Sequence, residues 1–421
     1  MPSNNHPLIL RNTMTGRKES FIPRQENTVK MFTCGPSIYS LPHIGNYRSF
    51  LYEDILYRYL EYLGYRVERV INFTDIEDKA LQAAARKGEE PEQLTAKAAN
   101  QFFRDCGLLH IKLPDYIPRS STSVDQAVHL IQVLMETGYA YRHKKEIFFD
   151  PLKFPGFGRL YGLDLSKWPK KRRRFRKDTY PGRRWNLGDF ILWHGHRPHQ
   201  DGSTFWDSPL GPGRPAWNIQ DPAMISKHMG FQVDICCGGV DNLYRHHDYN
   251  IAVIEAASGY EFCHYWLHGE HVLLDGKKIS KSEGNIIYPG QLLEEGISSG
   301  GLRWYLIDSH YRKRLNLTDK TIKKTENRCR HLKDMAHRFS SPIPEGCKKS
   351  SEGEKYINAL VEEFEKALNN DLQVNTALKS IEHNLGKLKG LLDKKNLNNS
   401  QRRRIEQNLI KIDSVLQVIY Q

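Results

Sequence analysis

A short apolar segment runs into a Gly/Pro/Ser turn and then into a long helical pattern between residues 31 and 65. The stretch MFTCGPSIYSLPHIGNYRSF supplies a strand, the turn and the start of the helix, and YEDILYRYLEYLGY continues that helix with apolar residues at helical spacing. VERVINF has the composition of a second strand. A strand, loop, helix and strand in this order form a βαβ unit, which pairs its strands in parallel. The chain is therefore predicted to be an α/β protein.

Later segments extend this pattern. Residues from about 80 to 140 have helical periodicity, and EIFFDP has strand character and opens an irregular insert. FQVDICCGG and YWLHGEHVLL each predict a strand, with a helix at NIAVIEAASGY between them. After about residue 315 the chain is helical and highly charged, with the apolar stripes typical of bundle helices and a polar linker at 340–353.

Composition narrows the class of protein. The 421 residues suggest two to four domains. The mean hydropathy is −0.62, and no stretch approaches the ~20 apolar residues of a membrane span. The N-terminus lacks the layout of a signal peptide, and the seven cysteines include no CxxC pair, so a disulfide framework is not expected. These features predict a soluble cytoplasmic protein with no membrane partner.

The net charge of +13 permits a polyanionic partner such as RNA, although many basic proteins bind none. Residues 167–184 carry ten Lys or Arg against one Asp. Such a run is commonly a solvated loop, but it can also grip phosphates, and Trp168, Phe175 and Tyr180 can stack on bases. Binding of tRNA or another RNA through this basic insert and a plain solvated loop both remain open.

Three short motifs carry the chemistry. In the first, His43, Gly45 and Asn46 form an HIGN sequence at the predicted strand-to-helix turn. The glycine permits close approach of a ligand to the backbone, and the N-terminus of a helix attracts phosphate. His43 and Asn46 can each donate to a phosphate oxygen. By itself the motif is also compatible with an ordinary turn.

The second motif is KISKS, with Lys278, Ser280 and Lys281 in DGKKISKSEGN. Two lysines three positions apart among small residues suit a loop that clamps pyrophosphate, and such a clamp stabilises charge that develops on the α-phosphate and the leaving group. The alternative is a solvated basic turn.

In the third motif, Gly238 and Gly239 allow a nucleoside to pack on the backbone, and Asp241 can accept from ribose hydroxyls.

The order of these motifs resembles that of class I aminoacyl-tRNA synthetases, and the segments resemble cysteinyl-tRNA synthetases in particular. CGPSIYSLPHIGNYRSF resembles CGPTVYD..HIGNARSF of that family, and NFTDIEDKALQAA resembles NITDVDDKII.RA. GDFILWHG, FWDSPLGPGRPAWNIQ, DICCGGVDNLYRHHDYNIAVIEA, YWLHG and DGKKISKSEGN also follow in family order, from about residue 8 to 395.

The resemblance implies a Rossmann-type class I catalytic domain with an insert, followed by a helical bundle. Its halves would span 1–115 and 214–270, with the insert at 116–213. A connecting domain with the KISKS loop would span 271–325, and the bundle 326–421. The family's terminal anticodon-binding domain has no counterpart, so the chain is expected to be a divergent, shortened member.

The resemblance also implies the ligands and the residues that hold them. The reaction would use ATP, Mg²⁺ and an amino acid. The residues implied to carry the chemistry are His43, Asn46, Lys278 and Lys281. The residues implied to bind the rest of ATP are Gly45, Gly238, Gly239, Asp241 and Ser280. The residues implied to bind the amino acid are Cys34, Gly35, Thr74 and Trp217.

The family selects cysteine with a zinc ion held by Cys, Cys, His and Glu, and the positions here match only in part. Cys34 and His246 keep the first and third ligands. Asp221 stands in WNIQDPAM where the family has WHIECSAM, and Asn250 stands where the family has the fourth ligand, Glu. Carboxylate binds zinc, but a neutral amide is a poor ligand. The ligands that remain plausible are Cys34, Asp221 and His246, and the exchanges favour absent or weak zinc and a substrate other than free cysteine.

Two functions from different classes follow from these features. The first is a ligase that forms aminoacyl-AMP and passes the aminoacyl group to a tRNA end or to a small amine. The small amine has a precedent in a shortened relative that joins cysteine to an amino sugar in mycothiol synthesis. The second is a non-catalytic tRNA- or RNA-binding paralogue, which the basic insert and altered metal site favour. The retained ATP motifs favour the ligase.

Overall fold

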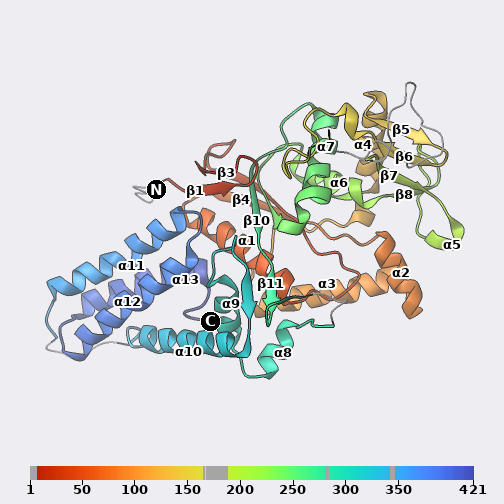
Figure 1. The fold of residues 1–421 in the computed structure, drawn as a ribbon. Coiled ribbons are helices and arrows are strands. Elements are labelled where there is room, and N and C mark those ends of the chain that lie inside the picture. The colour runs from red at the N-terminus through yellow and green to blue at the C-terminus, as the bar shows by residue number, and fades with distance from the viewer. Residues whose placement is uncertain (1–6, 165, 167–187, 280–283, 342–346) are drawn as a thin grey trace.

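The structure is a computed structural model, and Figure 1 shows its three parts in a row. A parallel sheet with its helices lies in the middle, a second sheet with α4 to α7 lies at one end, and a helical bundle lies at the other. The residues that the structure describes are 7–164, 166, 188–279, 284–341 and 347–421. None of the helices within these ranges is long and apolar enough to cross a membrane.

The central sheet has four parallel strands in the order β10-β9-β3-β4. They span Thr28–Thr33 (β3), Arg66–Ile71 (β4), Val233–Gly239 (β9) and Cys263–Gly269 (β10). Every residue of β9 is buried, as expected for an inner strand covered on both faces. The α/β architecture predicted from the first βαβ unit is confirmed.

The connections between these strands create a crevice. Helix α1 (Ile44–Tyr62) leads from β3 to β4, whereas α7 (Asp248–Ser258) lies between β9 and β10 in sequence. The chain therefore leaves β3 toward one edge of the sheet and leaves β9 toward the other. Ligands of doubly wound sheets bind at such a switch point, outside the carboxyl ends of the two central strands. Those ends are Thr33 in β3 and Gly239 in β9.

The predicted helical region near 80–140 forms three helices. They are α2 (Asp78–Lys87), α3 (Pro91–Leu108) and α4 (Val124–Glu136). Gly88 ends α2 with a φ of 64°, a left-handed conformation that favours glycine. Pro91 begins α3 at a position where the missing N–H has no helical partner. The two residue types thus fix the tight junction between α2 and α3.

A second, antiparallel sheet in the order β5-β6-β7-β8 lies largely within the segment predicted as the insert. Its strands are Ala140–His143 (β5), Glu146–Phe149 (β6), Phe190–Gly195 (β7) and Gly213–Pro215 (β8). The strand predicted at EIFFDP is therefore confirmed as β6. The short helix α5 (Pro198–Asp201) and helix α6 (Trp217–Met229) follow β7 and β8. The basic run at 167–184 lies outside the described residues.

Shorter strands form two further small sheets. An N-terminal hairpin pairs β1 (Ile9–Asn12) with β2 (Arg17–Ser20). A small sheet joins β11 (Val272–Leu274), β12 (Lys277–Lys278) and β13 (Leu315–Leu317). The single strand predicted at YWLHGEHVLL is wrong, because this segment is divided between β10 and β11. The pairing of β10 with β9 ends at Gly269, and β11 pairs instead with β12 and β13.

After two short helices, α8 (Pro289–Glu294) and α9 (Ser299–Ile307), the chain forms the predicted bundle. Its helices are α10 (Asp319–His337), α11 (Ser351–Asn369), α12 (Val374–Asp393) and α13 (Asn399–Leu416). Three of the four begin at a side-chain cap, from Thr318, Ser350 and Asn398. These caps satisfy amides that would otherwise lack a partner at the helix start.

A buried arginine connects the bundle to α1, the helix that begins within HIGN. Arg303 of α9 donates to the carboxylate of Asp54 of α1 at 2.6 Å and to the carbonyl of Leu416 of α13 at 2.7 Å. Arg303 and Asp54 are both fully buried, so each charge depends on the other for its stability there. The position of α1, and hence of its N-terminus, is therefore coupled to the packing of the C-terminal helices.

Candidate active site

A cavity of about 360 Å³ lies where the topology predicts it, outside the carboxyl ends of β3 and β9. Most of the residues that the sequence predicts as ligands meet in its wall. Those in the wall are Cys34, Gly35, His43, Gly45, Asn46, Thr74, Asp221, Gly239, Asp241, His246 and Lys278. Gly238 and Trp217 lie outside this wall. Ser280 and Lys281 fall outside the described residues.

The HIGN residues form the N-terminus of α1. His43 is the N-cap residue, and its Nδ1 accepts from the backbone N–H of Gly45 at 3.1 Å. The backbone N–H of His43 donates to Oδ1 of Asn46 at 2.9 Å, which completes a capping box. A Cβ at position 45 would lie 3.0 Å from the imidazole of His43, so a side chain there would crowd it. The wall thus holds a helix N-terminus, whose dipole favours a phosphate.

Two of the GGVD residues, Gly239 and Asp241, also line the cavity. The backbone N–H of Gly239 donates to Oδ1 of Asn242 at 2.8 Å, and a Cβ at Gly239 would clash with the carboxylate of Asp241. Gly238 lies just behind this wall, where its N–H donates to the hydroxyl of Tyr52 at 3.1 Å. Asp241 is therefore the group of this motif that can accept from a ligand in the cavity.

The described part of KISKS also reaches the cavity. Lys278 is the last residue of β12, and its carbonyl accepts from Nδ2 of Asn285 at 3.0 Å across the loop. Lys278 is exposed, whereas the next residue, Ile279, is buried in the core. Lys277 does not line the cavity. Of these two adjacent lysines, Lys278 is thus placed to contact a bound phosphate.

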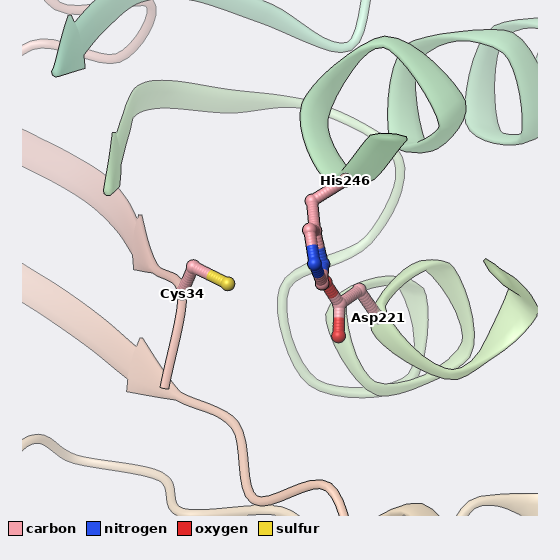
Figure 2. Close-up of side chains that lie close together, drawn as sticks. All are labelled: Cys34, Asp221 and His246. Atoms are coloured by element: carbon pink, nitrogen blue, oxygen red, sulfur yellow. The ribbon is translucent and has the colours of Figure 1, made fainter. Parts of the chain in front are cut away.

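Three potential metal ligands converge in the wall of the same cavity. Sγ of Cys34, a carboxylate oxygen of Asp221 and a ring nitrogen of His246 all lie within 4.8 Å of one another. Figure 2 shows Cys34 directly after a strand and facing Asp221 and His246, which come from two helical segments. These segments are α6 and the π-helix Leu243–His247.

Two asparagine side chains donate hydrogen bonds to two of these ligands. The sequence motifs did not identify either asparagine. Asn72 donates from Nδ2 to Oδ1 of Asp221 at 2.7 Å and accepts at Oδ1 from the N–H of Gly35 at 2.8 Å. Asn242 donates to Sγ of Cys34 at 3.4 Å. Asn72 directly follows β4, at the same edge of the sheet as Cys34 after β3, and that position is a signal that could have identified it.

The thiol of Cys34 is desolvated and lies near negatively charged carboxylates. Burial is the main cause that raises the pKa of Cys34 well above its usual value, and the carboxylate of Asp221 adds to it. Nδ1 of His246 lies 3.9 Å from Oδ2 of Asp221. The ring of His246 packs against Trp217, with their centroids 4.9 Å apart. Trp217 therefore supports a cavity residue from behind.

Cys34, Asp221 and His246 fit a zinc site with three protein ligands better than one with four. Thiolate, carboxylate and imidazole are all ordinary zinc ligands, and three protein ligands with an open position are typical of sites that bind a substrate. Asn250 directs its amide nitrogen to Oδ2 of Asp221 at 3.5 Å, so it acts as a hydrogen-bond donor. A neutral donor in this place contributes less to zinc affinity than the carboxylate of the family pattern.

Comparisons with known proteins agree on one family. The family model described as the tRNA synthetases class I (C) catalytic domain matches residues 20–327. A cysteine–tRNA ligase of Chlamydia pneumoniae is 36% identical over 420 residues, which is 98% of this chain and 86% of that protein. A cysteine–tRNA ligase of Chlamydia muridarum is 37% identical over 392 residues, or 93% of this chain and 82% of that protein.

Solved structures support the fold. Methionyl-tRNA synthetase of Mycobacterium tuberculosis, in complex with methionyl-adenylate, aligns with a TM-score of 0.65 at 16% identity. The alignment covers 93% of this chain and 90% of that one. The chain therefore belongs to the cysteinyl-tRNA synthetase family of class I tRNA synthetases, a family of ATP-dependent aminoacyl ligases.

Proposed function

We propose that the chain activates an amino acid with ATP as aminoacyl-AMP and transfers the aminoacyl group to an acceptor, a tRNA end or a small amine. The observation that carries this proposal is the shared cavity. A helix N-terminus suited to phosphate, with His43 and Asn46, opens into the same space as the cluster of Cys34, Asp221 and His246. One ligand that joins a phosphate to an amino acid spans both.

The residues suggest how the first step proceeds. An oxygen of the amino-acid carboxylate attacks the α-phosphorus of ATP, and the bond from this phosphorus to the β-bridging oxygen breaks to release pyrophosphate. The N-terminus of α1 and Lys278 stabilise the negative charge that develops on the phosphates. The family resemblance adds Lys281 to this role. Mg²⁺, when bound, would neutralise phosphate charge, and Asp241 would hold the ribose.

In the second step, an acceptor hydroxyl or amine attacks the carbonyl carbon of the adenylate. A new C–O or C–N bond forms, the acceptor loses a proton, and AMP leaves. Neither step requires a protein side chain to form a covalent bond. The contribution of the protein is to position the reacting groups and stabilise charge, which can account for large rate effects. Exchange of labelled pyrophosphate into ATP tests the first step without any acceptor.

We further infer that the amino acid is cysteine and that zinc binds more weakly than in a four-ligand site. Taken alone, the replacement of two zinc ligands of the family pattern favours absent or weak zinc binding and a substrate other than free cysteine. Convergence of Cys34, Asp221 and His246 supports a weak three-ligand site, and the names of the similar ligases support cysteine. When bound, zinc would hold the thiolate of the substrate, and it binds an alcohol such as serine poorly.

The basic insert is proposed to contact RNA. Replacing four arginines of the insert by uncharged residues is expected to weaken tRNA binding, because each arginine that pairs with a phosphate releases bound counterions. The four are Arg172, Arg173, Arg174 and Arg176. The slope of log affinity against log salt should fall by about one unit for each phosphate that is no longer neutralised. Binding is measured with unfractionated tRNA at several salt concentrations, with a variant carrying lysine at the same four positions as the control. Unchanged affinity and slope would indicate a solvated loop.

A further inference from the structure

A buried tyrosine of α1 reaches the strand end that carries GGVD. The hydroxyl oxygen of Tyr52 accepts from the backbone N–H of Gly238 at 3.1 Å. The same hydroxyl lies within donating distance of two carbonyl oxygens, at 2.9 Å from that of Gly238 and 3.1 Å from that of Leu267. Gly238 belongs to β9 and Leu267 to the neighbouring strand β10. One hydroxyl thus contacts two adjacent strands near their carboxyl ends.

Gly238 directly precedes the part of GGVD that faces the cavity. β9 ends at Gly239, and a short turn, Val240–Asn242, begins immediately after it. Gly239 and Asp241 both line the cavity. A hydrogen bond that holds the backbone of Gly238 therefore fixes the start of this turn and, with it, the position of the Asp241 carboxylate.

The ring of Tyr52 contacts a second part of the cavity wall from behind. Gly269, the last residue of β10, also lines the cavity. A Cβ at position 269 would lie 2.7 Å from a carbon of the Tyr52 ring, so the ring packs directly against the backbone there. Tyr52 itself is 4% exposed and does not line the cavity. It can therefore influence a ligand only through the backbone that it contacts.

The ring of Tyr52 is held in place by a second tyrosine. It stacks on Tyr311, with the ring centroids 4.8 Å apart and the planes 20° apart. The hydroxyl of Tyr311 donates to Oδ1 of Asp371 at 2.8 Å, and its carbonyl oxygen accepts from the N–H of Glu270 at 2.8 Å. Asp371 lies between α11 and α12 and is buried. The ring of Tyr52 is thus stacked on a side chain that is anchored in the bundle.

The hydroxyl of Tyr52 stays in the form that these contacts require. Burial raises the pKa of Tyr52 well above its usual value, so the hydroxyl keeps its proton. A protonated hydroxyl can accept from the N–H of Gly238 and donate to a carbonyl oxygen at the same time. A phenylalanine ring would fill the same space but would remove both interactions.

We propose that Tyr52 is a positioning residue for the nucleoside of ATP, and that its hydroxyl holds the end of β9 so that Gly239 and Asp241 meet the ribose and base. The inference rests on the proposed function, which supplies ATP as the ligand and Asp241 as the ribose contact. The phosphate side of the cavity is held differently, because His43 and Asn46 are fixed by the capping box of α1. Loss of the Tyr52 hydroxyl should therefore affect the nucleoside and spare the phosphates.

The test is Tyr52→Phe, which keeps the ring and removes the hydroxyl. Equilibrium dialysis with labelled ATP and Mg²⁺, without amino acid, is expected to show binding about tenfold weaker than in wild type, as for loss of a buried hydrogen bond. Inorganic tripolyphosphate, which lacks the nucleoside, should compete equally well for both proteins. In the exchange assay the KM for ATP should rise by a similar factor, while kcat and the KM for the amino acid should change by less than about twofold.

Tyr59→Phe is the matched control. Tyr59 is also a buried tyrosine of α1, and its hydroxyl donates to Oδ1 of Asn369 in the bundle at 2.8 Å. Its replacement removes a buried hydroxyl from the same helix at a residue that does not line the cavity. Thermal unfolding should show comparable destabilisation of the two variants, whereas only Tyr52→Phe should bind ATP more weakly.

A double-mutant cycle tests whether Tyr52 acts through GGVD. Asp241→Asn alone is expected to weaken ATP binding, because the amide is a poorer acceptor for ribose hydroxyls than the carboxylate. If Tyr52 positions that carboxylate, Tyr52→Phe should weaken ATP binding much less in the Asp241→Asn protein than in wild type. A purely structural role of Tyr52 would give the same loss in both proteins.

The outcomes separate this inference from the proposed function. Equal ATP affinity of Tyr52→Phe and wild type would contradict the role of Tyr52. A loss that tripolyphosphate or Tyr59→Phe shares, or one that adds to that of Asp241→Asn, would also contradict it, because each indicates a general effect on the fold. The dialysis needs neither amino acid nor turnover. A chain that binds ATP but exchanges no pyrophosphate would contradict the proposed function, and the role of Tyr52 would still be decided by the dialysis.

Discussion

Replacing His43 by alanine is expected to lower amino-acid-dependent exchange of pyrophosphate into ATP about 10²–10³-fold, the range for loss of one charge-stabilising donor. His43 lies at the N-terminus of α1 in the cavity wall, where phosphate charge would develop. Lys281→Ala is expected to have an effect of the same size, from its place in KISKS. Rates at saturating ATP and amino acid measure the loss at the chemical step.

Two controls separate chemistry from folding in this experiment. His43 also caps α1, so its removal is expected to cost about 0.5–2 kcal/mol of stability. His43→Asn retains a side chain that caps well, and should recover the stability but not the rate. Lys277→Ala removes a lysine next to Lys278 that does not line the cavity, and should exchange normally. Full activity of His43→Ala would contradict a phosphate-binding role for this residue.

Zinc bound by the wild-type protein is expected to be lost in Cys34→Ala, because only two of the three converging ligands remain. Titration of the wild-type protein with zinc should saturate at close to one ion per chain, measured by equilibrium dialysis and elemental analysis. Cys347→Ala removes a thiol remote in sequence from the cluster, and should retain the metal. The selection of cysteine over serine is expected to fall with the metal, since zinc binds thiolate far better than an alcohol.

The converse experiment restores the zinc ligands of the family pattern and is expected to strengthen zinc binding at the same site. Asp221→Cys/Asn250→Glu is expected to raise zinc affinity by more than the roughly 10–100-fold that outer contacts alone provide. Competition with a chelator measures the change. An affinity equal to that of wild type would show that the ion binds elsewhere. A wild-type protein that activates cysteine efficiently without zinc would show that the pocket recognises the thiol without a metal.

The sequence predicted the parts of the site that follow from strand order. Cys34 comes directly after β3, the two glycines of GGVD end β9, and the carboxyl ends of parallel strands meet at one edge of the sheet. The glycine-containing turn before α1 likewise predicted a helix N-terminus at this edge. Local pattern was sufficient for these features because a few residues determine the direction and end of each element.

The sequence could not predict contacts that depend on how separate segments pack. Asn72 and Asn242 lie far from Asp221 and Cys34 in sequence, and each could have faced solvent as well. Asn250 is predicted from its position to replace a metal ligand, whereas its contact with Asp221 arises from the approach of α6 to α7. YWLHGEHVLL was predicted as one strand, although the polar and small residues His268–His271 interrupt its apolar pattern where the strand partner changes.

Exchange of labelled pyrophosphate into ATP, measured with each standard amino acid in turn, tests the central claim most directly. The measurement requires only the purified chain, ATP, Mg²⁺ and zinc, and it reports activation whether or not the acceptor is present. We expect exchange that depends on cysteine, with serine well below it, and loss of this exchange in His43→Ala. A wild-type protein that binds tRNA but supports no exchange with any amino acid would contradict the ligase assignment and favour a non-catalytic RNA-binding member of the family.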